Sequence, residues 1–211
     1  MSLYEQTLRR PGGGGLYAFK PGFQRRLLGT AEWLAAHGVH PDVLTFAAVA
    51  CGLLGGLALA AGTSQPLVLW TVPPLAGLRL ALNALDGMVA TRRGLARPWG
   101  KVLNELCDRL ADLAFFVPLL LVPGARPALV AVALCATLLV SFLGVLAEAA
   151  GAGRQYGGLM GKADRMLWLA LACAATAASG QLWFLQALPA ALLGGAAITL
   201  IQRGRRTHAA L

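Results

Sequence analysis

Six long apolar runs separated by short polar connections dominate this sequence. They cover residues 43–61, 66–85, 105–122, 127–148, 164–178 and 182–201. About 20 apolar residues are needed for a helix to cross the hydrocarbon core of a bilayer. In a chain of 211 residues, six such runs leave no room for a separate soluble catalytic domain. Any chemistry must therefore lie within membrane helices or in their short connections.

The charge is strongly basic, with 18 Lys and Arg residues against 9 Asp and Glu residues. In a soluble protein this balance would favour nucleic-acid binding. Here the basic residues flank the apolar runs instead, so nucleic acid is not expected as a partner. Most Lys and Arg residues lie on the side of the N-terminus, whereas the opposite connections carry only Arg126. The positive-inside rule therefore predicts six transmembrane helices with both termini cytoplasmic, in a multi-pass protein of the cytoplasmic (inner) membrane.

The predicted fold class is an all-α integral membrane protein in four parts. Residues 1–18 contain a glycine run and are expected to form a flexible N-terminal segment. Residues 19–42 alternate basic and apolar side chains, which predicts an N-terminal amphipathic interfacial helix leading into the first span. A soluble cap over the helix bundle is the alternative for that segment. Residues 43–202 form the six-helix transmembrane domain, and residues 203–211 form a basic C-terminal tail.

Acidic and amide side chains gather at the cytoplasmic ends of the second and third runs. Asn83 and Asp86 are three residues apart, and Asn104, Asp108 and Asp112 repeat every four residues, so each set shares a helical face. A carboxylate near the centre of a span costs about 2.5–3.5 kcal/mol on insertion scales, so positive partners are expected.

Two kinds of positive partner fit the acidic cluster. Its four carboxylates carry a formal charge of −4, which matches two divalent cations, and oxygen ligands suit Mg²⁺, Mn²⁺ or Ca²⁺. The alternative is a structural network of ion pairs with nearby arginines. The four carboxylates belong to Asp86, Glu105, Asp108 and Asp112.

The order and spacing of these residues resemble the motif of the CDP-alcohol phosphotransferase family, D-x2-D-G-x2-A-R-x8-G-x3-D-x3-D. The segment before the first apolar run, His40-Pro41-Asp42-Val43-Leu44-Thr45, looks like the family's T-P-N-x-x-T segment. The likeness covers most of the chain from about residue 20. The residues in register with the motif are Asp86, Gly87, Ala90, Gly100 and Asp108.

Three motif positions depart from the family pattern. Asn83 and Asn104 stand where the family has its first and third Asp, and Thr91 replaces the Arg, with Arg92 one position later. The two amides lower the formal charge of the motif from −4 to −2. An amide oxygen still ligates a hard cation, but more weakly than a carboxylate does.

The resemblance implies a membrane transferase of phospholipid biosynthesis. It would move a phosphatidyl group from CDP-diacylglycerol to an alcohol acceptor and release CMP, with Mg²⁺ or Mn²⁺ as cofactor. A soluble CDP-alcohol donor with a lipid acceptor is one alternative, and a catalytically weakened or non-catalytic family member is another. A small transporter with an intramembrane acid relay is the alternative outside the family.

The resemblance also implies roles for individual residues. Asp108 matches the last Asp of the motif, the proposed general base. The expected metal ligands are Asp86, Asp108, Asn83 and Asn104, with Glu105 and Asp112 as candidates that restore charge. The nucleotide is expected to contact Gly87, Ala90, Gly100, Pro41 and Thr45. Phosphate or acceptor binding is expected from Arg79, Arg92, Lys162 and Arg165.

Each of these roles has a structural alternative. The two motif glycines could serve close helix packing, Lys162 and Arg165 could be membrane anchors, and Arg79 could pair with Asp86. A homodimer is expected from the family, and the small-xxx-small pair Gly52 and Gly56 would suit its interface. The same two glycines could equally serve packing within one chain.

Overall fold

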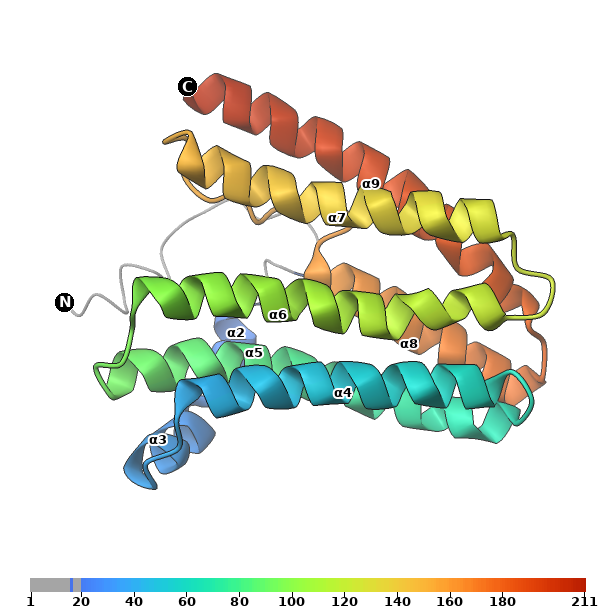
Figure 1. Ribbon diagram of the computed structural model, residues 1–211, viewed down its shortest axis with the longest axis horizontal. Helices are drawn as coiled ribbons and strands as arrows, with labels where there is room; N and C mark the ends of the chain where they lie inside the picture. The colour runs from blue at the N-terminus through green and yellow to red at the C-terminus, as the bar shows by residue number, and fades with distance from the viewer. Residues whose placement is uncertain (1–15, 17–19) are drawn as a thin grey trace.

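In the part of the chain that the computed structural model describes, residue 16 and residues 20–211, long helices run side by side as a bundle (Figure 1). The flexible segment predicted over 1–18 lies outside these residues, apart from Leu16. The 3₁₀ helices η2 and η3 join α4 to α5 and α6 to α7. The long segments are α4 (Pro41–Gly62), η2 (Pro66–Thr71) with α5 (Val72–Arg92), α6 (Pro98–Phe116) with η3 (Val117–Leu121), α7 (Pro127–Ala149), α8 (Lys162–Ser179) and α9 (Trp183–Ala210).

Prolines and glycines mark the helix boundaries. Pro41, Pro98 and Pro127 each occupy the first position of a helix, where the missing N–H leaves no hydrogen bond unmade. Helix α8 is followed by Gly180, which has a φ of 72° and so adopts the left-handed conformation that favours glycine.

Four helical segments are long and apolar enough to cross a bilayer. They are Pro41–Gly62, Pro66–Arg92, Pro127–Ala149 and Trp183–Ala210. Helices α6 and α8 lie among them but carry charged residues of the polar cluster. In the part of the chain that the structure describes, the regular elements are all helices, and these four segments indicate an integral membrane protein.

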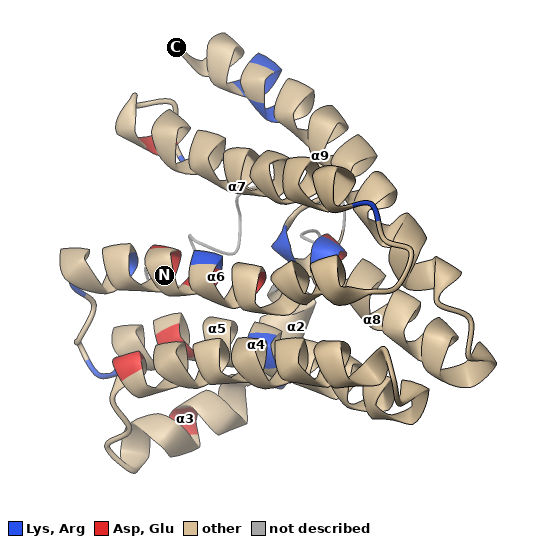
Figure 2. Ribbon diagram, turned by 45° about the vertical axis from the view of Figure 1, so that its right-hand side comes forward, with Lys and Arg blue, Asp and Glu red and all other residues tan. Residues whose placement is uncertain are grey.

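The two ends of the bundle differ in charge. The C-terminus, α3 and the α5–α6 connection lie at one end, and the α4–η2, η3–α7 and α8–α9 connections lie at the other (Figure 1). Lys, Arg, Asp and Glu residues lie mostly in the half that holds the C-terminus (Figure 2). The opposite half contains a continuous apolar core built from residues such as Leu69, Phe115, Leu169 and Leu185. The bundle thus has an apolar half, which contains this core, and a half that carries most of the charged residues (Figure 2).

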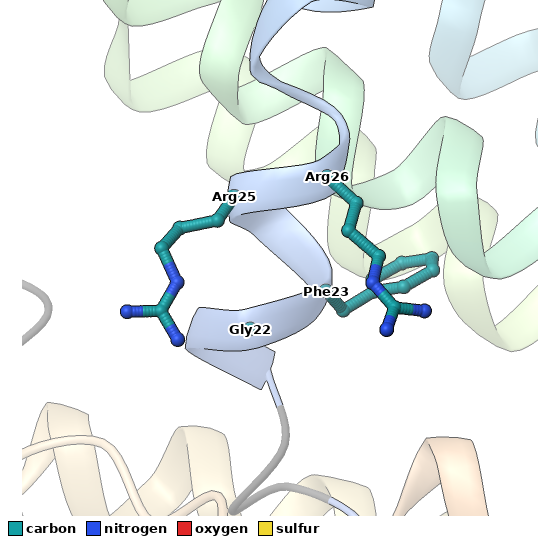
Figure 3. A pocket seen from close by; sticks show the side chains of 4 residues that line it. All are labelled: Gly22, Phe23, Arg25 and Arg26. Carbon is teal, nitrogen blue, oxygen red and sulfur yellow. The ribbon is translucent and has the colours of Figure 1, made fainter.

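The segment before α4 forms two short helices rather than one. They are α2 (Lys20–Arg26) and α3 (Leu28–Ala36), and they meet at Leu27. Helix α3 packs on α5 through Ala31, which is buried against Met88 and Val89. The side chains of Arg25 and Arg26 extend to either side of α2 and, with Gly22 and Phe23, line a hollow of about 550 Å³ (Figure 3). Exposed arginines beside an apolar residue are typical of a helix at a membrane surface.

The glycines of α4 allow close packing against α6. A Cβ at Gly52 would lie 2.9 Å from the Cα of Ala111, and a Cβ at Gly56 would collide with the carbonyl oxygen of Ala114. The small-xxx-small pair therefore serves packing within one chain.

Replacing Gly56 with alanine is expected to lower the free energy of unfolding by about 1–3 kcal/mol, because the new methyl group meets backbone atoms of α6. Unfolding by sodium dodecyl sulfate in mixed micelles measures this change. Gly77→Ala is the matched control, because no described atom lies within 4 Å of a Cβ there. Equal stability of the two variants would contradict this account of the α4–α6 contact.

Candidate active site

Three helices meet at Asp86, which lies on α5 and is 4% exposed. One carboxylate oxygen, Oδ2, accepts hydrogen bonds from Thr45 Oγ1 on α4 (2.9 Å) and from Asn104 Nδ2 on α6 (2.5 Å). The other, Oδ1, accepts from the backbone N–H of Gly87 (2.5 Å). Among the described residues, no Lys, Arg or His nitrogen lies within 4.0 Å of this carboxylate. Asp86 is thus held by neutral donors only.

Asp108, on α6, is also buried but lies among cations. Its Oδ2 pairs with the Lys162 ammonium at the start of α8 (2.6 Å), and its Oδ1 accepts from the Asn83 amide on α5. Two guanidinium groups approach it more loosely, Arg109 at 3.6 Å and Arg79 at 3.8 Å. Asn83 and Lys162 therefore fix the carboxylate from two other helices.

Asp112 lies one turn further along α6 and forms a buried ion-pair cluster. Its Oδ1 accepts from Arg79 Nη2 (2.7 Å) and its Oδ2 from Arg165 Nη2 (2.8 Å). Arg79 is completely buried and also donates to the backbone carbonyl of Asp108 (2.9 Å). The sequence left open whether Arg79 pairs with Asp86. In the structure Arg79 pairs with Asp112 instead. Asp112 is enclosed by guanidinium groups and is not part of the network around Asp86.

Glu105 likewise pairs with an arginine. Its carboxylate accepts from Arg154, in the connection between α7 and α8, and Arg154 also reaches Glu148 on α7 (3.2 Å). We expected Glu105 and Asp112 to restore charge at a metal site, but in the structure both carboxylates form ion pairs with arginines. For these two residues, the ion-pair alternative describes the structure.

The remaining donor set still fits a divalent cation. Within the described residues, no three Asp, Glu, His or Cys side chains gather closely enough to form a metal site by themselves. However, the carboxylates of Asp86 and Asp108 and the amides of Asn83 and Asn104 belong to adjoining hydrogen-bonded groups on α5 and α6. Oxygen atoms of this kind are the ligands that Mg²⁺ and Mn²⁺ prefer.

A cavity of about 440 Å³ opens beside Asp108. Its lining includes Asn83, Asn104 and Asp108 together with Arg154, Lys162 and Arg203. The cavity therefore combines a carboxylate with several positive groups, an arrangement suited to an anionic ligand that also carries a reactive hydroxyl group.

Arg203 is a buried residue of the cavity lining that the sequence analysis did not single out. The predicted C-terminal tail begins at this residue, but α9 continues to Ala210 and Arg203 is only 6% exposed. Its guanidinium donates to the carbonyls of Val140 (2.6 Å), Tyr156 (2.8 Å) and Gly157 (2.9 Å). It thereby ties the α7–α8 connection to α9. The available signal was its spacing of four residues from Thr199, which lies within the last apolar run.

The other expected ligand-binding residues have mixed surroundings. Gly87 has no described atom within 4 Å of a Cβ, so close helix packing does not explain it. Gly100 faces the side chain of Arg97, and Ala90 is half-buried. Pro41 begins α4 one turn before Thr45.

Among the basic residues expected to bind phosphate, Arg92 lies apart from the other three. It approaches Glu32 of α3 (3.7 Å), whereas Lys162 and Arg165 line the cavity and Arg79 lies buried beside Asp112.

Two curated relatives resemble this chain closely. The inner membrane protein YnbA of Escherichia coli is 40% identical over 152 residues, which is 72% of this chain and 75% of that protein. The phosphatidylinositol phosphate synthase of Cutibacterium acnes is 31% identical over 200 residues, which is 88% of this chain and 93% of that enzyme. No family model matches the sequence.

The fold is that of a solved synthase. Crystal structures of Mycobacterium tuberculosis phosphatidylinositol phosphate synthase match at 24% identity over 85% of this chain, with a TM-score of 0.70 for the form with CDP-DAG bound and 0.71 for the form with manganese and citrate. The matched segments cover 92% of the synthase chain with CDP-DAG bound and 88% of the chain with manganese and citrate. The family resemblance found in the motif is thereby confirmed. This chain belongs to the CDP-alcohol phosphotransferase family, which includes these synthases, and is a membrane-bound transferase.

Proposed function

We propose that this chain transfers the phosphatidyl group of CDP-diacylglycerol to a hydroxyl group of a phosphorylated alcohol and releases CMP. The relatives named as phosphatidylinositol phosphate synthases, and a neighbouring structure with CDP-DAG bound, support the donor. The observation that carries the acceptor is the cavity that Asp108 lines together with Arg154, Lys162 and Arg203.

The charge of the cavity favours an acceptor that already carries a phosphate. Five basic residues and three acidic residues line it, an excess of two positive charges. Asp112 and Glu148 lie outside the lining and pair with Arg165 and Arg154, so the excess belongs to the cavity wall and not to the whole cluster. A phosphate monoester can accept charge-assisted hydrogen bonds from this wall that are stronger than those of a neutral alcohol. The basic residues are Arg109, Arg154, Lys162, Arg165 and Arg203, and the acidic residues are Glu105, Asp108 and Asp164.

Asp108 is the proposed general base. The Lys162 ammonium, at 2.6 Å, and the Asn83 amide orient its carboxylate. Once an acceptor phosphate is bound by Arg154 and Lys162, the acceptor hydroxyl would lie beside Asp108, which takes its proton as the oxygen attacks the donor phosphorus. The CMP leaving group carries away the electron pair of the broken P–O bond.

The chain's own residues would hold the donor at the opposite face of the site. Asn83, Asp86, Asn104 and Asp108 would hold Mg²⁺ or Mn²⁺, which neutralises the donor diphosphate when bound. Thr45 keeps Asp86 oriented through its hydroxyl (2.9 Å). Pro41, Gly87, Ala90 and Gly100 would contact the nucleotide, with the open space at Gly87 letting the ligand approach the backbone.

The proposed topology has six spans with both termini on the cytoplasmic side of the inner membrane. It is supported by the gathering of charged residues in the half of the bundle that holds the C-terminus (Figure 2) and by the inner-membrane relative. In this topology α6 and α8 are spans whose charged ends meet the cytosol. A homodimer stays a prediction from the family resemblance.

The proposed activity is tested with purified protein, radiolabelled CDP-diacylglycerol and Mg²⁺ or Mn²⁺. CMP release is expected with phosphorylated polyols and at least about tenfold less with the same polyols without phosphate. No release with any acceptor would refute the activity, and equal release would refute the phosphate requirement. Competition by soluble CDP-alcohols would instead favour the alternative donor.

Replacing Arg203 with lysine is expected to raise KM for the phosphorylated acceptor about tenfold, with a smaller effect on kcat. Lysine keeps the charge, but its donors lie on one nitrogen. It cannot reach all three carbonyls that Nε, Nη1 and Nη2 of Arg203 contact, so the α7–α8 connection loosens. Steady-state CMP release measures both constants. Arg206→Lys, at an exposed position of α9, is the control. A fall in kcat at unchanged KM would contradict this positioning role.

A further inference from the structure

We infer that this site binds one divalent cation, at Asp86, and that the Lys162 ammonium supplies the second positive charge, at Asp108. The inference rests on the proposed function, because it concerns the cation that the transferase reaction uses. The four carboxylates could match two divalent cations, and the inference lowers this number to one.

The first step is an inventory of the four carboxylates near the motif. Asp112 pairs with Arg79 and Arg165, at 2.7 and 2.8 Å. Glu105 pairs with Arg154. These two carboxylates are already neutralised by guanidinium groups of the chain, so they add no negative charge for a metal ion.

The second step concerns Asp108, which already has a cation. The Lys162 ammonium lies 2.6 Å from Oδ2, within direct hydrogen-bonding distance. The side chain of Lys162 reaches Asp108 from the first residue of α8, in the wall of the cavity. The ammonium therefore contacts the carboxylate of α6 at the wall of the cavity.

The third step concerns Asp86, which is buried with no cation beside it. Its described partners are the Thr45 hydroxyl, the Asn104 amide and the Gly87 N–H. The charged form of a buried carboxylate held only by neutral donors is costly, so binding of a cation that compensates this charge is favoured. Asp86 is therefore the carboxylate at which a divalent cation gains most.

A second divalent cation would meet repulsion. Asn83 and Asn104 contribute oxygen atoms but no charge, while Lys162, Arg109 and Arg79 lie within 4.0 Å of Asp108. Two divalent ions would add four positive charges to a motif that carries two negative ones. In the low-dielectric interior that excess is strongly unfavourable.

The stoichiometry is measured with Mn²⁺ alone, by counting free Mn²⁺ with electron paramagnetic resonance during titration of the purified full chain in detergent. The wild type is expected to bind one Mn²⁺ per chain, and Asp86→Asn none. The double variant Asn83→Asp with Asn104→Asp restores two charges and is expected to bind two. Two ions on the wild type, or one retained by Asp86→Asn, would overturn the inference.

The role of Lys162 is tested by Lys162→Met in the same titration. Removing the ammonium lowers the positive potential near Asp86, so Mn²⁺ is expected to bind about tenfold more tightly. Lys101→Met, which removes the same charge from an exposed position of α6, is the matched control with unchanged affinity. Equal affinity of the Lys162→Met variant and the wild type would contradict the assignment of Lys162.

The metal titration separates this inference from the proposed function. CMP release with two bound ions would refute the single-cation site and leave the transferase activity standing. One bound ion without CMP release from any acceptor would refute the activity and leave the cation stoichiometry standing. Retained thermal unfolding temperatures identify variants that are folded.

Discussion

CMP release is expected to fall by about 10²- to 10⁴-fold when Asp108 is replaced with asparagine, which is the usual contribution of a general base. Asparagine keeps the size of the side chain and a hydrogen-bond acceptor for Lys162, but it cannot take the proton of an acceptor hydroxyl. The cavity beside Asp108 is open to ligands, so the residual charge of Lys162 can be hydrated and the fold is retained. Initial rates at saturating donor and acceptor measure the effect.

Two measurements make the Asp108 test specific. Glu32→Gln removes a carboxylate from the exposed face of α3 and is expected to leave the rate unchanged. The thermal unfolding temperature of the Asp108→Asn variant is expected to stay close to that of the wild type. Full turnover by Asp108→Asn would refute the assignment of the base, whatever the outcome for the metal.

Replacing Asp112 with asparagine, one turn further along α6, is expected to lower the free energy of unfolding. Asp112→Asn leaves the buried guanidinium groups of Arg79 and Arg165 without their shared carboxylate. Breaking a buried ion pair by removing one partner costs about 3–5 kcal/mol. Unfolding by sodium dodecyl sulfate in mixed micelles, with helix content followed by circular dichroism, measures the loss.

Comparison with an exposed pair and with a double variant tests the reason for that loss. Glu32→Gln breaks a pair whose carboxylate is exposed and is expected to change stability by less than about 1 kcal/mol. Adding Arg79→Met to Asp112→Asn removes one of the two uncompensated charges and is expected to recover part of the loss. A double variant less stable than Asp112→Asn alone would contradict the proposed cause.

Local features of this protein could be predicted from residue order alone. The lengths of the apolar runs predict membrane helices, because length and hydropathy decide whether a segment crosses a bilayer. The spacing that places Asn83 beside Asp86, and Asn104 beside Asp108, follows from the helical repeat. The family also followed from the motif, and the relatives confirmed it.

Pairings between helices could not be predicted in the same way. Arg79 lies within two turns of Asp86 on one helix, yet it pairs with Asp112 on another. Glu105 is adjacent to Asn104, yet it faces Arg154. Which side chains meet depends on how far each helix is rotated and how closely it packs, and the glycines of α4 set that distance against α6.

The role of Arg203 shows the same division. In residue order it begins a run of basic residues, which is typical of a cytoplasmic tail. In three dimensions it is the buried donor to three carbonyls on two other segments. Hydropathy and helical spacing act within a segment and can be read from residue order. Counter-ions for buried charges come from whichever helix packs alongside, so only the assembled bundle decides which carboxylate remains available for a metal ion.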